Sequence, residues 1–293
     1  MFKRIFLFIL TNLLIITTIN ILLHVLGVHG YLTAEGIDYR ALLTICFCYG
    51  MGGAFISLML SKVMAKWMMG VKTIDPQDAG QYAWLVSTVH NLAMKANLPS
   101  PEVGVYESNS PNAFATGPTK SSSLVAVSTG LLSSMSRDEL EGVLAHEVAH
   151  IANGDMVTMT LLQGIINAFV MAISRIIAYA IASRNSKNSS AAVNSLVIIV
   201  LQITLSLLGS VVICWFSRKR EFRADQGSAE LASRQKMIAA LKALQRTIDI
   251  PEPKKRPSFA ALQISSKGSF INLFRTHPEL SDRIKALEEN YSI

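Results

Sequence analysis

Four long apolar runs dominate the hydropathy pattern of the chain: residues 5–23, 41–60, 156–183 and 193–216. The first, second and fourth contain no charged residue. Each run has about 20 residues or more, which is the length of a helix that crosses a bilayer. The pattern therefore predicts about four transmembrane helices, arranged as two hairpins.

Two of these runs have an alternative interpretation. Asn167 and Arg175 interrupt the third run, and a charge inside a membrane is costly. The third and fourth runs could instead form a buried helical hairpin within a soluble domain. The first run, which follows Lys3 and Arg4, is too long for the apolar core of a signal peptide. No small-residue cleavage site follows it, so we interpret it as a retained anchor.

Lysine and arginine are unevenly distributed around the four runs, and this distribution predicts their orientation. They precede the first run and follow the second and the fourth: Lys3, Arg4, Lys62, Lys66, Lys72, Arg218, Lys219, Arg220 and Arg223. The two short connections within the hairpins carry few of them. Because positively charged flanks stay in the cytoplasm, we expect both termini and residues 62–155 on the cytoplasmic side.

The composition agrees with a membrane protein. Of the 293 residues, 51% are hydrophobic and only 16% are charged, and the mean hydropathy is +0.37. The net charge of +7 is explained by this topology and by contact with anionic lipid, so no nucleic-acid partner is expected. Cys46, Cys48 and Cys214 lie within apolar runs, which argues against a disulfide framework and against a role as metal ligands.

The candidate chemistry lies between the second and third runs, in the segment from His146 to His150. Two histidines four positions apart share one helix face and can bind one metal ion. Glu147 follows the first histidine and is placed to take a proton from a metal-bound water. This spacing is typical of a zinc hydrolase, although an ordinary amphipathic helix can also carry two histidines.

Flanking residues predict that this motif lies on a helix over residues 137–152. Ser136 and Glu139 match a capping box at its start. Asn153 and Gly154 both tolerate a left-handed backbone and give a plausible end.

A catalytic zinc usually has three protein ligands, and Glu221 is the best remaining candidate. Glu221 and Asp225 are four residues apart, so Glu221 can bind the metal while Asp225 hydrogen-bonds a ligating histidine. Alone, such a pair is weak evidence, because it is more often a solvated acidic face. A hairpin formed by the third and fourth runs would, however, bring Glu221 back beside the histidine helix, at the cytoplasmic membrane surface.

Three motifs together resemble one known family. They are the segment from His146 to His150, the segment from Glu221 to Asp225, and Thr276-His277-Pro278 with Arg283. Arranged around four apolar runs, they are similar to the HtpX family of bacterial heat-shock-linked membrane zinc endopeptidases, which is related to the CAAX prenyl proteases. The resemblance extends through nearly the whole chain.

The resemblance implies a function. We expect one zinc ion per subunit, cleavage of misfolded or damaged membrane proteins, and self-cleavage. We also expect the protein to lie in the bacterial cytoplasmic (inner) membrane as a multi-pass protein, in contact with the lipid bilayer and with its active site on the cytoplasmic side. Two other functions are a membrane metal carrier, which the charged histidine helix disfavours, and an inactive chaperone-like scaffold, which the intact Glu147 disfavours.

Two further segments gain an interpretation from the resemblance. Asn112 and Ala113 match an edge strand, which could hold a substrate peptide by strand addition; a simple turn is the alternative. His277, before an amphipathic helix over residues 279–289, could donate to the oxyanion or to Glu221, with Arg283 bracing the site by an ion pair. The alternative is a surface histidine that caps this helix.

The predicted fold is a membrane-anchored α+β protein. It combines about four transmembrane helices with a mostly helical, zincin-like metalloprotease domain that has a small sheet. We expect a transmembrane hairpin over residues 1–62 and a second over residues 156–216. The catalytic domain would comprise residues 63–155, with the histidine helix, and residues 217–293, with the third ligand. Within it, strands are expected over residues 102–107, 113–116 and 123–128, after an amphipathic helix over residues 77–96.

Overall fold

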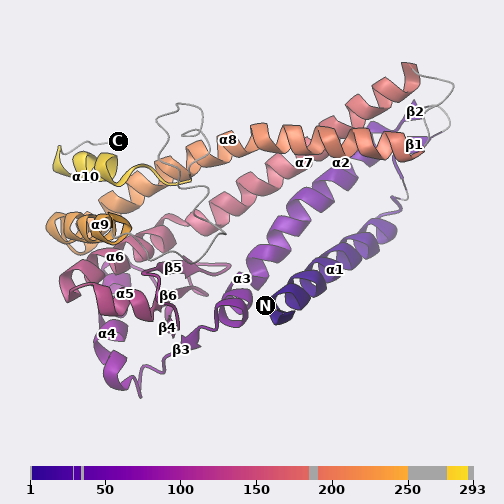
Figure 1. The fold of residues 1–293 in the computed structure, drawn as a ribbon. Coiled ribbons are helices and arrows are strands. Elements are labelled where there is room, and N and C mark those ends of the chain that lie inside the picture. Colours follow the sequence, from indigo (N-terminus) through magenta and orange to yellow (C-terminus); the bar gives the residue numbers. More distant parts are fainter. Residues whose placement is uncertain (1, 29, 34–35, 185–190, 250–275, 290–293) are drawn as a thin grey trace. The chain divides into compact units, whose positions relative to one another are not determined.

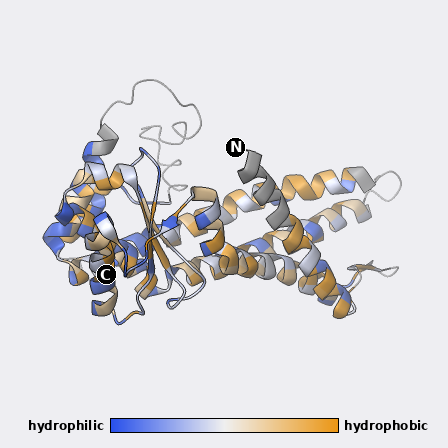
Figure 2. Ribbon diagram, turned by 90° about the horizontal axis from the view of Figure 1, so that it is seen from below, coloured by the Kyte–Doolittle hydropathy of each residue, from blue (hydrophilic) through white to orange (hydrophobic). Residues whose placement is uncertain are grey.

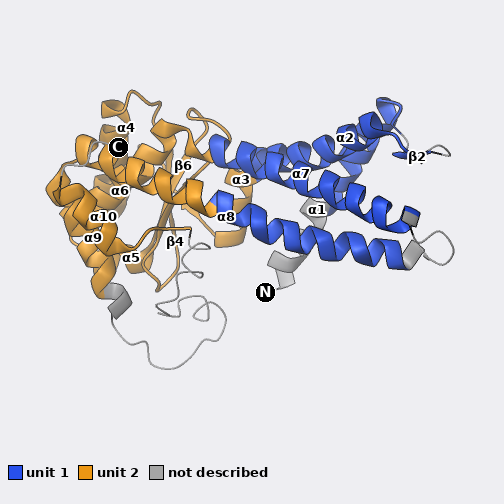
Figure 3. Cartoon of the chain, turned by 90° about the horizontal axis from the view of Figure 1, so that it is seen from above, with its two compact units in different colours: residues 1–60, 157–213 blue, residues 61–156, 214–293 orange. Residues whose placement is uncertain are grey.

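The computed structural model describes residues 2–28, 30–33, 36–184, 191–249 and 276–289 (Figure 1). The chain divides into two compact units, each made of two separate segments (Figure 3). Unit 1 comprises residues 1–60 and 157–213, and unit 2 comprises residues 61–156 and 214–293.

Unit 1 is built from long apolar helices. Its elements are α1 (Phe2–Val25), the hairpin strands β1 (Leu32–Thr33) and β2 (Gly36–Ile37), α2 (Tyr39–Phe47), the π-helical turn η1 (Cys48–Gly52), the first part of α3 (Gly53–Met69), and most of α7 (Asp155–Arg184) and α8 (Ala191–Leu231). Because α2, η1 and α3 run on without a break, the predicted second apolar run becomes one long helix. Gly50 allows it to approach α7 closely, since a Cβ atom there would lie only 2.6 Å from the Ala168 backbone nitrogen.

Three of the described helices are long and apolar enough to cross a membrane: Tyr39–Met69, Asp155–Ser183 and Val193–Leu231. A shorter apolar helix covers Leu13–Val25. Hydrophobic residues line the long helices in Figure 2, and many are exposed, including Phe169, Leu196 and Leu208. An apolar surface of this kind needs lipid around it, so the expected membrane-anchored, mostly helical fold is confirmed.

Unit 2 combines a small sheet with helices. Its elements are the end of α3, β3 (Lys72–Thr73), η2 (Gly80–Tyr82), α4 (Ala83–Lys95), β4 (Glu102–Tyr106), β5 (Ala113–Thr116), β6 (Leu124–Ser128), α5 (Thr129–Ser134), α6 (Arg137–Asn153), the end of α8, α9 (Arg234–Asp249) and α10 (Leu280–Glu288). The three predicted strands are confirmed. The helix expected over residues 77–96 begins later, because the Asp75 side chain accepts a bond from the Gln77 amide in a turn that precedes it.

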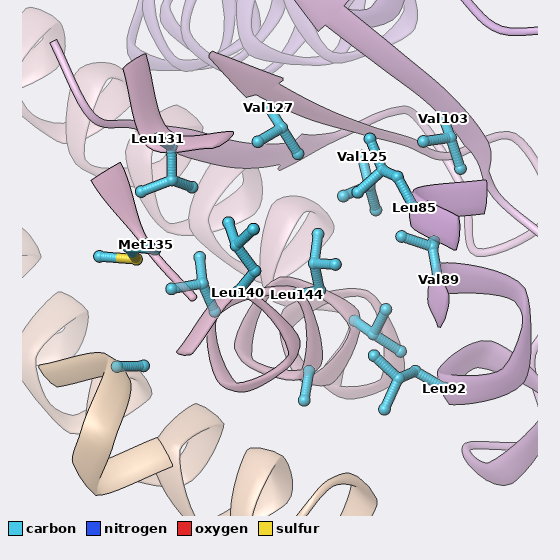
Figure 4. Packing of buried hydrophobic residues seen from close by; sticks show 14 of the residues in the cluster. Leu85, Val89, Leu92, Val103, Val125, Val127, Leu131, Met135, Leu140 and Leu144 are labelled. Carbon is cyan, nitrogen blue, oxygen red and sulfur yellow. The ribbon is translucent and has the colours of Figure 1, made fainter. Parts of the chain in front are cut away.

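The sheet has the order β3-β4-β6-β5, with β4 parallel to β6 and β5 antiparallel to β6. Alternate residues of the strands face opposite sides. Val103, Val125 and Val127 face a core that α4 and α6 complete with leucines such as Leu85 and Leu144 (Figure 4). On the other face, Tyr106, Leu124 and Ala126 form a smaller cluster with Val71. This core holds α6, the histidine helix, against the sheet.

Candidate active site

Helix α6 carries the two histidines on its buried side. The predicted capping box is present: the Ser136 side chain accepts from the Glu139 amide, and the Glu139 carboxylate accepts from the Ser136 amide. Gly154 ends the helix in a left-handed conformation with φ of 68°. The predicted helix is therefore confirmed to within one residue at its C-terminal end.

The structure brings together the three expected ligand candidates, His146, His150 and Glu221, all of them buried. Their ligand atoms lie within 4.8 Å of one another. The Nε2 atoms of His146 and His150 are 3.1 Å apart. Glu221 Oε2 lies 3.5 Å from His146 Nε2, and Glu221 Oε1 lies 3.5 Å from His150 Nε2. Two nitrogens and a carboxylate therefore converge on one point, as a metal site requires.

The opposite ring nitrogen of each histidine faces a buried carboxylate. His150 Nδ1 lies 2.6 Å from Asp155 Oδ2. His146 Nδ1 lies 2.9 Å from Asp225 Oδ1. A proton held on each Nδ1 leaves each Nε2 lone pair free for a metal. The donor set thus fits a bound metal ion.

Asp155 is a site residue that the sequence interpretation missed. It is 3% exposed and begins α7, directly after the Gly154 turn. A carboxylate five residues after the second histidine was the available signal. The role of this carboxylate depends on the left-handed turn at Gly154, which bends the chain so that Asp155 lies beside the His150 ring.

Small residues allow α8 to approach α6 closely. A Cβ atom on Gly227 would lie 2.9 Å from Ala149 Cβ. The Ser228 hydroxyl donates to the Gly142 carbonyl at 2.9 Å. This close contact places Glu221 and Asp225, on the same helix, beside the two histidines.

Arg283 of α10 holds the two acidic residues from the other side. Its Nε and Nη2 atoms donate to the two carboxylate oxygens of Asp225 at 2.7 and 2.5 Å, and Nη1 lies 3.5 Å from Glu221 Oε2. The expected ion pair is therefore made mainly with Asp225. Residues Ile284 and Leu287 of α10 pack against α9 in a separate cluster, which fixes Arg283 in place.

The charges at the site shift one another's pKa values. Burial would raise the pKa of Glu221, but hydrogen bonds from His146 and His277 lower it. Burial would likewise raise the pKa of Asp225, but Arg283 and His146 lower it. Burial would lower the pKa of His146, yet Asp225 and Glu221 raise it to about 9. The carboxylates therefore stay ionised and make the pocket attractive to a cation.

His277 reaches the same carboxylate. Its Nδ1 lies 3.0 Å from Glu221 Oε2, while its side chain remains 63% exposed. The N-cap residue of α10 is Glu279, and its side chain makes no capping hydrogen bond. His277 is therefore at the surface but faces Glu221, and it does not cap the helix.

Glu147 and strand β5 are the remaining features that the sequence predicted for the site. Glu147 is half-buried, and its carboxylate makes no hydrogen bond or ion pair with another described residue. Among the described strands, β5 pairs only with β6, and it also contacts α6. Asn112, just before it, makes two hydrogen bonds with Ser128: its amide donates to the Ser128 side-chain hydroxyl, and its carbonyl accepts from the Ser128 amide. Asn112 thus extends the pairing of an edge strand that starts at Ala113.

Known proteins resemble this chain along its whole length. The sequence profile of peptidase family M48 matches residues 79–291. A "Protease HtpX homolog" of Verminephrobacter eiseniae is 49% identical over 292 residues, covering 98% of each chain. One from Bacillus licheniformis is 50% identical over 296 residues, covering 98% of this chain and 99% of the other. The crystal structure of S. mikatae Ste24p has a TM-score of 0.63 at 17% identity, covering 98% of this chain and 67% of that one, and so shows a similar fold.

The fold and the site together define a membrane metalloprotease. The apolar helices supply the membrane part, and the cluster of His146, His150 and Glu221 could hold a metal ion. The chain belongs to peptidase family M48, and its full-length relatives are HtpX-type proteases.

Proposed function

We propose that the protein is a zinc-dependent endopeptidase of the bacterial cytoplasmic membrane that cleaves misfolded or damaged membrane proteins, with its active site on the cytoplasmic side. The observation that carries the proposal is the convergence of His146 Nε2, His150 Nε2 and Glu221, with Asp225 and Asp155 behind the two rings. The relatives named as HtpX-type proteases support the proteolytic chemistry.

His146, His150 and Glu221 would hold one zinc ion per subunit. When bound, zinc supplies a Lewis acid that activates water and polarises the scissile carbonyl. Glu147 follows His146 in the sequence, and its carboxylate makes no hydrogen bond or ion pair with the described side chains. It can therefore act as a base. It takes a proton from the attacking water and later delivers that proton to the leaving amine.

The substrate peptide would lie along β5. The free edge of this strand can bind an extended segment through backbone hydrogen bonds, beginning at Asn112 and Ala113. Helix α6, which carries Glu147, contacts β5. Tyr106 packs against Phe114 of β5, with ring centroids 5.7 Å apart. Self-cleavage would use the same strand.

His277 would stabilise the reaction in two ways. Its Nδ1 supports Glu221, and the exposed remainder of the ring can donate to the oxyanion that forms on the scissile carbonyl. Arg283 and Asp225 would hold Glu221 and His146 in position.

The ligand and base assignments are separable by metal analysis and digestion of a casein substrate in detergent. His146→Ala should lose both zinc and proteolysis, because the ligand set is broken. Glu147→Gln should keep zinc near one equivalent and lose proteolysis, because only the base is removed. A Glu147→Gln protein that still digests casein contradicts the base assignment, and a His146→Ala protein that keeps its zinc contradicts the ligand set.

The orientation is tested with topology reporters. A reporter fused after Lys72 or at the C-terminus should report the cytoplasm, and one inserted near residue 33 should report the opposite side. A reporter near residue 188 that also reports the cytoplasm would leave the zinc site untouched but reduce α7 and α8 to a hairpin that does not cross the membrane.

A further inference from the structure

Unit 1 contains a polar cavity that proteolysis does not use. Its volume is about 370 Å³, which is within the range of small-molecule sites. Residues from α1, the following loop, α2 with η1, and α7 line it, and the polar ones are Asn20, His24, Tyr31, Tyr49 and Arg175. A cavity with five polar side chains within a group of apolar helices calls for an explanation.

The charge in this cavity comes from Arg175, in the apolar helix α7. A charged residue in such a helix is costly and usually marks a functional site. Its guanidinium donates a hydrogen bond from Nη1 to the Met171 carbonyl oxygen at 3.0 Å. No carboxylate of a described residue lies within ion-pair distance of it. A guanidinium has five N–H donors, so the described residues use only a small part of its hydrogen-bonding capacity.

The other lining groups also favour an anion. Among the described residues that line the cavity, none is an aspartate or a glutamate. The Tyr49 hydroxyl donates to Asn20 Oδ1 at 2.8 Å, which leaves the Asn20 amide group to donate. The Asp38 carboxylate caps α2, because its Oδ1 accepts hydrogen bonds from the amides of Arg40 and Ala41 at the start of this helix. The cavity therefore presents donors and one fixed positive charge.

The position of Arg175 indicates which anion is within reach. It lies nine residues before Arg184, the last residue of α7, or about 14 Å along the helix axis. A long arginine side chain can reach from this depth toward the headgroup region. Exposed apolar residues of α1 and the following turn, such as Ile21, Val25 and Leu26, are close to the cavity in sequence. They provide a surface for an acyl chain.

We propose that this cavity binds a phosphate group, with Arg175 as its charged ligand and Asn20 and Tyr31 as further donors. The planar guanidinium fork matches two phosphate oxygens. The adjoining apolar surface favours the phosphodiester of a membrane phospholipid as its source, with free phosphate as the other source. The site is independent of the proteolytic centre and does not rest on the proposed function.

The test is the melting temperature of the full-length protein in detergent, with three additives in separate arms. These are dioleoyl phosphatidylglycerol, dioleoylglycerol, which has the same acyl chains without phosphate, and inorganic phosphate. At about a hundred times the dissociation constant, phosphatidylglycerol should raise the melting temperature of the wild type by roughly 5–10 °C, and dioleoylglycerol should not. A shift with inorganic phosphate as large as that with the lipid would identify free phosphate as the source.

Variants then locate the effect. Arg175→Gln should abolish the shift, and Arg175→Lys should retain a smaller one because it keeps the charge without the fork. Arg40→Gln is the matched control, since Arg40 is exposed in the same unit, and it should respond like the wild type. An equal shift in the wild type and Arg175→Gln overturns the proposal. If Arg175→Gln does not fold, equal effects of the two lipids on the wild type overturn it by themselves.

Discussion

The ion pair between Arg283 and Asp225 should be among the most costly interactions to break in unit 2. Arg283 is 6% exposed and Asp225 is 2% exposed, and two parallel hydrogen bonds of 2.7 and 2.5 Å join them. Replacing Arg283 by methionine keeps much of the side-chain volume but leaves a buried carboxylate without its partner. Breaking a buried pair in this way costs about 3–5 kcal/mol in the free energy of unfolding.

A matched control exists on the same helix. Lys242 of α9 and Glu288 of α10 also form an ion pair, at 3.4 Å, but both side chains are 53% exposed. Because solvent screens such a pair, Lys242→Met should cost no more than about 1 kcal/mol. Both variants remove one positive charge that links α10 to the rest of unit 2, so their comparison isolates the effect of burial.

The assay is denaturant-induced unfolding of the detergent-solubilised protein, followed by tryptophan fluorescence. The pH dependence provides a second measurement. The pKa of Asp225 is lower than its ordinary value of 3.8, so its contribution is complete above that value and declines as the pH falls toward the lower folded pKa. The difference in the free energy of unfolding between the wild type and Arg283→Met should therefore become smaller as the pH falls below about 4. An Arg283→Met loss no larger than that of Lys242→Met would refute the reasoning.

Two further substitutions test the groups around the proposed metal. Asp155→Asn should weaken zinc binding by about 10- to 100-fold, because the carboxylate that orients His150 is lost; chelator competition measures this, and unchanged affinity would remove Asp155 from the site. His277→Ala should lower kcat by about a hundredfold, as expected for a donor to the oxyanion, while zinc content stays near normal. An unchanged kcat would leave His277 as a surface residue beside Glu221.

Local sequence was sufficient for those parts of the protein whose physics is local. The spacing of His146 and His150 places both rings on one helix face wherever that helix lies. The capping residues Ser136 and Gly154 set the ends of α6, because they satisfy or terminate the hydrogen bonds of the helix itself. The long apolar runs predicted membrane helices for the same reason, since length and composition alone decide whether a helix can cross a bilayer.

Only the tertiary structure decided how distant polar groups pair. Asp155 is an unremarkable helix-starting residue until the turn at Gly154 brings it to 2.6 Å from His150. Arg283 was expected to brace the site, but the structure assigns its two short bonds to Asp225, with Glu221 at 3.5 Å. The edge position of β5 likewise follows from the strand order, which no single strand specifies. A side chain's partner depends on which helices and strands pack together, and that packing is settled by the whole core at once.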